Sequence, residues 1–265
     1  MGAMGTIVTV VDAFTDRPFR GNPAAVCILD GPADEDWMQN VAAEMNLPAT
    51  AFCHAEGEIW RLRWFTPRAE LDLCGHGTLA TTHVLRSSGV EGTIRYSTHS
   101  GLLAAQSLPD GIVLDFPADP TTKAEAPKGL LAALGVPDDT AVRKGRADYL
   151  VALEDEAAVR AIRPTFSLLR RVDCRGVSVT APGDPDADHD VVSRFFVPSI
   201  GIDEDSVTGS AHCTLASYWS ARLERDRLRY HQASARGGEL EVTRVGDRVE
   251  LFGQAVITMR GEFVS

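Results

Sequence analysis

The chain has 265 residues, which is enough for one large domain or two domains of ordinary size. It contains 26 Lys and Arg residues and 37 Asp and Glu residues, and the resulting net charge of −11 argues against nucleic acid or an anionic membrane surface as a partner. Its apolar runs are shorter than the roughly 20 residues of a membrane span, and its first residues do not resemble a signal peptide. We therefore expect a cytoplasmic protein.

The five cysteines are odd in number and scattered, and none belongs to a CxxC pair. This argues against a disulfide framework and against a structural zinc site, so we expect free thiols. The histidines at positions 54, 83 and 212 lack the spacing of a metal-binding motif. No metal is expected.

Apolar periodicity predicts the elements of the first part of the chain. We expect helices over residues 34–46, where Asp34 is a capping residue, and over residues 76–88, which Gly89 ends. Strands are expected at residues 6–14, 26–29, 51–54, 59–65, 93–98, 101–106 and 111–116. Residues 117–129 are polar and rich in proline, and they are predicted to form a linker.

The remainder of the chain has a similar mixture of elements. Helices are expected at residues 130–134, 156–162 and 209–222. Strands are expected at residues 148–153, 176–181, 191–197, 240–245, 248–252 and 255–260. Because strands outnumber helices, we predict an α+β fold in which a mixed or antiparallel sheet surrounds each apolar helix, and not a doubly wound parallel sheet.

One arrangement occurs twice, at residues 63–80 and again at residues 194–216. In each copy an aromatic strand ends at a proline, and a turn of small residues opens an apolar helix. We therefore expect two related halves, residues 1–117 with about 255–265, and residues 118–254. Each copy directs the N-terminus of a helix, and a site between two such ends suits a small anionic substrate.

Characteristic blocks of residues lie along nearly the whole chain, at 12–15, 21–26, 44–47, 50–52, 74–78, 205, 207–212 and 236–239. Together they resemble the PhzF-like family of phenazine biosynthesis isomerases. Several long blocks in the right order are more specific than one short motif. The resemblance implies the diaminopimelate epimerase-like fold, with two pseudo-symmetric halves that each wrap a mixed sheet or barrel around a central helix. It also implies a homodimer and a reaction without metal or organic cofactor.

The resemblance assigns proton transfer between substrate carbons to Glu44, with His76 and Asp205 as its polar partners. A carboxyl group in a desolvated pocket can both donate and accept a proton near neutral pH. Glu44 also lies near the C-terminal end of its predicted helix, where a negative charge opposes the helix dipole. His76, at a helix start, is expected to be mostly neutral and able to relay a proton. Asp205 could hold a substrate amine or hydroxyl group.

The substrate-binding residues that we expect are those of the two helix starts. Backbone N–H groups can approach a substrate carboxylate closely at glycines, and Ser210 matches a hydroxyl that contacts substrate in the family. The set is Gly75, Gly77, Thr208, Gly209 and Ser210.

Two alternatives remain open. Racemases and epimerases of this fold use two opposed thiols, and Cys74 stands where the first would be, so it is a possible catalytic thiol. Thr208 occupies the second position, and Cys213 lies about one helical turn later. The other alternative is a non-catalytic protein that binds a small molecule.

Four positions depart from the family pattern. Ser206 stands where proline is expected and could loosen the loop that carries Asp205. Gly77 replaces a common alanine, and residues 48–49 replace a common Ser-Glu pair.

Overall fold

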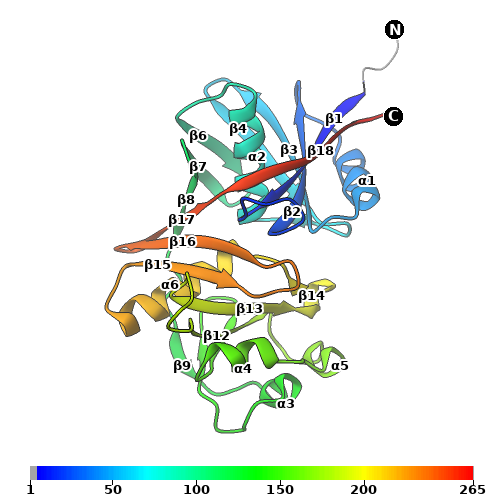
Figure 1. Ribbon diagram of the computed structural model, residues 1–265. Helices are drawn as coiled ribbons and strands as arrows, with labels where there is room; N and C mark the ends of the chain where they lie inside the picture. The colour runs from blue at the N-terminus through cyan, green and yellow to red at the C-terminus, as the bar shows by residue number, and fades with distance from the viewer. Residues whose placement is uncertain (1–4, 265) are drawn as a thin grey trace. The chain divides into compact units, whose positions relative to one another are not determined.

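The computed structural model describes residues 5–264. The chain forms two compact units, unit 1 (Met1–Asp115 and Leu251–Ser265) and unit 2 (Phe116–Glu250). Both combine strands of mixed direction with few helices, as the sequence predicts (Figure 1). No helix within the described residues is long and apolar enough to cross a membrane.

Unit 1 contains two helices among its strands, and its last strand comes from the end of the chain. In order, its elements are β1 (Thr6–Ala13), β2 (Asn22–Leu29), α1 (Glu35–Met45), β3 (Ala49–Glu56), β4 (Ile59–Phe65), β5 (Glu70–Leu71), α2 (Gly75–Ser87), β6 (Thr93–Thr98), β7 (Gly101–Leu108), β8 (Gly111–Pro117), whose last two residues belong to unit 2, and β18 (Ala255–Phe263).

Unit 2 has one long helix and several short ones. Its elements are β9 (Thr122–Ala124), α3 (Leu130–Leu134), β10 (Val142–Lys144), β11 (Tyr149–Ala152), α4 (Glu156–Ala161), α5 (Phe166–Leu169), β12 (Val177–Pro182), β13 (Val191–Val197), the 3-10 helix η1 (Pro198–Ile200), β14 (Ile202–Asp205), α6 (Gly209–Leu223), β15 (Arg227–Gln232), β16 (Gly238–Val245) and β17 (Arg248–Gly253), which crosses back to unit 1.

The repeat seen in the sequence is also a repeat of strand pairing. In unit 1, β3 is parallel to β2 and antiparallel to β4, and β4 is antiparallel to β5 and parallel to β6. In unit 2, β12 is parallel to β11 and antiparallel to β13, and β13 is antiparallel to β14 and parallel to β15. The two units therefore share one topology around their long helices, α2 and α6.

One ion pair has the same geometry in both units. In unit 1, Arg63 Nε and Nη2 donate to the two carboxylate oxygens of Glu70 at 2.6 and 2.7 Å. In unit 2, Arg194 makes the same two bonds to Glu204 at 2.8 and 2.9 Å. Each guanidinium lies over the ring of the phenylalanine two residues later, 5.1 and 4.9 Å from its centre. The repeated arginine thus holds the strand that precedes each long helix.

Strand β2 shows why an apolar run without alternation forms a strand here. Successive side chains of a strand point to opposite faces, and residues 24–27 are buried on both. Ala25 and Cys27 pack with Met38 and Val41 of α1 in one cluster. The other face of the strand is covered by α2, which also contacts β1, β3 and β18. One central helix and one outer helix therefore enclose this part of the sheet.

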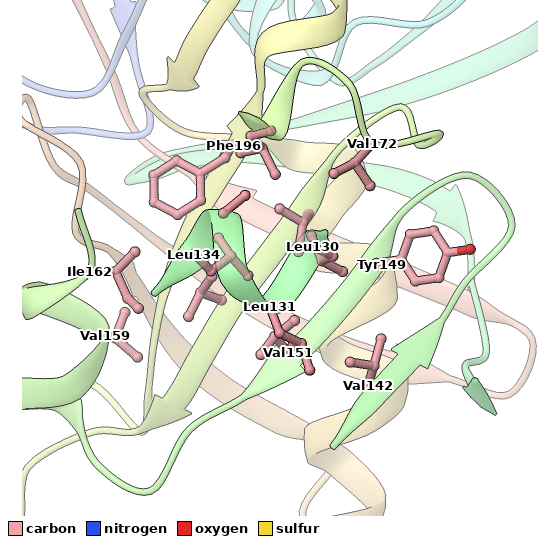
Figure 2. Packing of buried hydrophobic residues seen from close by; sticks show 14 of the residues in the cluster. Leu130, Leu131, Leu134, Val142, Tyr149, Val151, Val159, Ile162, Val172 and Phe196 are labelled. Atoms are coloured by element: carbon pink, nitrogen blue, oxygen red, sulfur yellow. The ribbon is translucent and has the colours of Figure 1, made fainter. Parts of the chain in front are cut away.

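Unit 2 has its own core beside the long helix. Figure 2 shows the cluster, in which side chains from α3 and α4 meet those of β10 to β13. Leu130 and Leu134 of α3 are almost fully buried against Val151 and Phe196. These short helices are far below the length at which an isolated helix is stable, so packing of their apolar faces maintains them.

Several segments differ from the sequence-based expectation, and the short elements β5, β10, β14 and α5 were not predicted. Strand β2 begins at Asn22, four residues before the start predicted at residue 26. The predicted linker contains β9, which pairs with β10. Strand β15 was not predicted, because its alternating pattern contains only two apolar residues, Leu228 and Tyr230, and its third buried position is the polar Gln232.

Candidate active site

Helix α2 begins with a thiol and an imidazole side by side. Cys74 is the N-cap, in extended conformation (φ −143°, ψ 103°), and its Sγ accepts the Gly77 N–H at 3.4 Å. The Sγ atom also lies 3.5 Å from His76 Nδ1. Both side chains are largely buried, with 5% of Cys74 and 8% of His76 exposed. The structure therefore brings together two of the predicted site residues of unit 1.

Trp64 covers this helix start from β4. A Cβ atom built on Gly77 would lie 2.7 Å from Trp64 Cδ1 and 3.0 Å from Cys74 Sγ, so glycine is the residue that fits beside this indole. The departure from alanine at position 77 is thus matched to a large neighbour. Trp64 was not predicted as a residue of the site.

Glu44 lies at the end of α1, the position expected from the sequence. The helix stops at Met45, and Asn46 closes it in the left-handed conformation (φ 50°), donating its N–H to Ala42 O. The last turn carries no basic residue, so the Glu44 carboxylate faces the negative end of the helix dipole without compensation. Its side chain is exposed, and unit 1 does not supply the desolvated pocket that the sequence analysis anticipates.

The loop before α6 is held by a network around Asp205. Thr208 Oγ1 donates to Asp205 Oδ2 at 2.6 Å. Gln232 of β15 accepts the Thr208 N–H at 2.9 Å and donates from Nε2 to Asp205 O at 2.8 Å. Ser234 Oγ donates to Ser206 O at 2.8 Å. These bonds hold the loop that the absence of proline at position 206 was expected to loosen.

Gln232 is a functional candidate that sequence reasoning missed. It is almost fully buried, and its amide joins the N-cap of α6 to the Asp205 backbone. A lone glutamine in a strand that was not predicted offers little signal.

Arg175 is a second residue that was missed. It precedes β12 and lies beside the first turn of α6, with Nη2 3.4 Å from Ser210 Oγ. Its guanidinium is paired with the buried Asp148 carboxylate, to which Nε donates at 2.8 Å and Nη2 makes a second, shorter bond. The only signal in the sequence is that each residue is a charge at the edge of a predicted apolar strand.

The side chains that follow in α6 point inward. Burial raises the pKa of the Cys213 thiol to about 12, and Cys213 Sγ lies 3.7 Å from Gly209 O. Burial also lowers the pKa of His212 to about 4, although the bond from Nδ1 to Thr208 O, at 2.8 Å, opposes the shift. At neutral pH both groups are uncharged.

A metal centre would need several ligating side chains in one place. Within residues 5–264, no group of three or more His, Cys, Asp and Glu side chains is arranged to hold a metal ion.

The predicted site residues thus fall into two groups. Glu44, Cys74 and His76 belong to unit 1, and Asp205 and the residues at the start of α6 belong to unit 2. Within unit 2 the structure brings Asp205 together with Thr208. A shared site formed by both groups stays a prediction.

Comparison with solved structures defines the class of fold. A hydroxyproline epimerase from Agrobacterium vitis matches 97% of this chain and 90% of its own with a TM-score of 0.59 at 12% identity, a likeness of fold alone. A PhzF-family protein from Enterococcus faecalis matches 98% of this chain and 99% of its own, with a TM-score of 0.92 at 42% identity. The fold is therefore that of the epimerase-like α+β proteins.

Sequence comparison narrows the class to a family. A family model described as phenazine biosynthesis-like protein matches residues 11–261. An uncharacterized isomerase of Halalkalibacterium halodurans is 44% identical over 265 residues, covering 98% of this chain and 99% of its own. The chain belongs to the phenazine biosynthesis-like (PhzF-like) family. Family and relatives together support a function of the isomerase or epimerase type.

Proposed function

We propose that this chain is a cofactor-independent isomerase in which Glu44 takes a proton from one carbon of a small carboxylate-bearing substrate and delivers it to another. His76 and Asp205 assist by hydrogen bonding or by relaying the proton. The cytoplasmic location and the homodimer expected from the sequence belong to the same proposal.

The observation that carries this choice is the N-cap of α6. The two long helices have their N-caps at Cys74 and at Thr208, so the position that would hold the second thiol of a two-thiol racemase holds a hydroxyl group. That hydroxyl donates to Asp205 and cannot act as a base at neutral pH. The nearest thiol in α6, Cys213, is kept protonated by burial. The absence of a second thiol at the start of α6 favours proton transfer by a carboxylate over a two-thiol mechanism.

A second candidate function rests on the first turn of α2. Cys74 Sγ lies 3.5 Å from His76 Nδ1 and accepts the Gly77 N–H, so an imidazole that could exchange a proton with the thiol lies beside it. Such a thiol could act with one other group on opposite faces of a stereocentre, as in an epimerase.

The experiment is deuterium uptake in D₂O, followed by NMR. The wild type and Glu44→Gln are incubated with trans-2,3-dihydro-3-hydroxyanthranilate and a panel of chiral amino and hydroxy acids. We expect uptake by the wild type and a loss of about 10²- to 10⁴-fold in the variant, the usual contribution of a general acid or base. Glu58→Gln, in the exposed turn between β3 and β4, is the control and should behave as the wild type. Equal uptake by Glu44→Gln and wild type would contradict the proposal.

A further inference from the structure

The two side chains of the Asp148–Arg175 ion pair differ in their exposure to solvent. Only 3% of the Asp148 side chain is exposed, against 44% of the Arg175 side chain. Burial raises the pKa of the Asp148 carboxyl, and the Arg175 guanidinium opposes that shift. A buried ion pair contributes little net stability, because desolvation offsets the attraction of the charges. Its clearest effect here is to orient the arginine.

The guanidinium has one edge available. Nε and Nη2 face Asp148, which leaves the edge formed by Nη1 and Nη2. Within the described residues the contact on that edge is the 3.4 Å approach of Nη2 to Ser210 Oγ. The planar fork of arginine matches a carboxylate in bidentate geometry, and an arginine can hold one carboxylate on each edge.

Neighbouring groups fix the arginine further. The guanidinium lies 6.0 Å from the centre of the Phe195 ring. The Arg175 carbonyl accepts a hydrogen bond from Ser199 Oγ at 2.6 Å, which holds the backbone. The side chain is therefore preorganised before any ligand arrives, which lowers the entropic cost of binding.

The start of α6 beside it favours an anion. Thr208 makes no side-chain cap bond to the helix, because its hydroxyl is directed to Asp205. The first turn contains no acidic residue, although the Asp205 carboxylate lies beside the N-cap, where it accepts the Thr208 hydroxyl. In a chain of net charge −11, Arg175, the Ser210 hydroxyl and the backbone N–H groups of this helix end are the groups that can bind negative charge here.

The repeat shows that this cation is specific to unit 2. Thr50 pairs with Phe65 in unit 1, and Val177 pairs with Phe196 in unit 2. Counting back two residues from Thr50 and from Val177 makes Pro48 the equivalent of Arg175. Unit 1 thus has an uncharged residue where unit 2 has a guanidinium.

We propose that Arg175, oriented by Asp148, binds the substrate carboxylate together with Ser210 at the start of α6. This deepens the proposed isomerase function and rests on it for the identity of the substrate. Arg175 is then the residue that selects carboxylates over neutral analogues, and Asp148 is a positioning residue.

The test compares benzoate with benzamide, a planar pair that differs in the charge of one group. Each is titrated into wild-type protein labelled with ¹⁵N-arginine, and the Arg175 Nε signal is identified by its absence in Arg175→Gln. We expect benzoate to shift this signal and benzamide to leave it in place. Arg175→Gln should bind benzoate about 10- to 100-fold more weakly, the usual effect of a charge-assisted hydrogen bond.

Two variants complete the design. Arg222→Gln removes an exposed guanidinium from the last turn of the same helix and should leave benzoate binding unchanged. Asp148→Asn combined with Arg175→Gln removes both charges, so that no unpaired carboxylate remains buried if the single variant unfolds; it should bind benzoate as weakly as Arg175→Gln. Benzoate binding by this double variant as tight as that of the wild type, or benzamide binding as tight as benzoate in the wild type, would overturn the proposal.

Failure here is distinct from failure of the proposed function. Glu44→Gln should lose deuterium uptake and keep benzoate binding, whereas Arg175→Gln should lose benzoate binding. Deuterium uptake that depends on Glu44, together with benzoate binding that is unchanged in Arg175→Gln, would support the proposed isomerase function and contradict the proposed carboxylate site at Arg175.

Discussion

The starts of α2 and α6 are built on one plan and differ in the groups they present. Both follow a strand held by the same arginine–glutamate pair, and both open with glycine. The N-cap of α2 is a thiol that bonds to its own helix, whereas the N-cap of α6 is a hydroxyl that bonds to a carboxylate in the preceding loop. The backbone arrangement is thus repeated in the two units, whereas the functional groups at the two helix starts differ.

The two helix starts also differ in the sizes of the side chains that pack together there. The third residue of α2 is Gly77, packed beneath Trp64, and the third residue of α6 is Ala211, packed in one cluster with Phe195. A larger aromatic residue in unit 1 therefore faces a smaller helical residue. The two helix starts therefore fill equivalent spaces with different pairs of side chains.

The largest effect on stability is expected from the fourth residue of each long helix, which is Thr78 in α2 and His212 in α6. Thr78 Oγ1 donates to Cys74 O at 2.7 Å, and His212 Nδ1 makes the equivalent bond to Thr208 O at 2.8 Å. Since Nδ1 donates to a carbonyl, the uncharged ring has its lone pair on Nε2, and this buried atom has no hydrogen-bond partner within the described residues. Protonation there would leave a buried charge without an acceptor.

We therefore predict a loss of stability as the pH falls. The pKa of His212 is about 4 in the folded chain against 6.5 when unfolded, so the unfolded state takes up the proton first. The contribution is fully present above pH 6.5 and is lost as the pH falls through 4, by about 3 kcal/mol. Urea unfolding from pH 7 to 4 measures it. His212→Thr should have a flatter pH dependence even if it is less stable at pH 7; an unchanged slope would contradict the account.

The next effect tests the size match in unit 1. Gly77→Ala should lose about 2 kcal/mol of stability, because its Cβ would overlap the Trp64 indole. Trp64→Phe introduces the aromatic residue found in unit 2, and in combination with Gly77→Ala it should recover part of that loss. A double-mutant cycle by urea unfolding gives the coupling. Purely additive effects of the two substitutions would show that they do not compensate.

The smallest effect compares the two N-caps. Thr208→Val removes the hydroxyl that donates to Asp205 and should cost about 1 kcal/mol. Cys74→Ser keeps an acceptor for the Gly77 N–H and introduces a residue that is common at N-caps, so it should cost less. Thermal unfolding of the two variants ranks them. A greater loss in Cys74→Ser would reverse the comparison.

The sequence predicts those parts of the fold that depend on local periodicity. The helix expected over residues 34–46 is α1, Glu35–Met45, and the helix expected over 76–88 is α2, Gly75–Ser87. Both have apolar faces with ordinary helical spacing and recognisable starts. Strand β15 was not predicted because its alternating pattern contains only two apolar residues, and β9 was not predicted because it is short and lies in a proline-rich segment.

The candidate site is less predictable, because its contacts join distant residues. Arg175 meets Asp148 across 27 positions and Ser210 across 35, and these contacts depend on strand register. Glu44, Cys74, His76 and Asp205 were found through their motif context, which says nothing about their hydrogen-bond partners. The network around Gln232 follows from a strand that periodicity did not indicate.

The most direct test of the central claim is to compare Glu44→Gln with Cys74→Ser in the same D₂O incubation. We predict that deuterium uptake is lost in Glu44→Gln and retained in Cys74→Ser, because the proposed mechanism assigns proton transfer to the Glu44 carboxylate. The opposite result, uptake that survives in Glu44→Gln and disappears in Cys74→Ser, would contradict the account and assign the chemistry to the thiol at the start of α2.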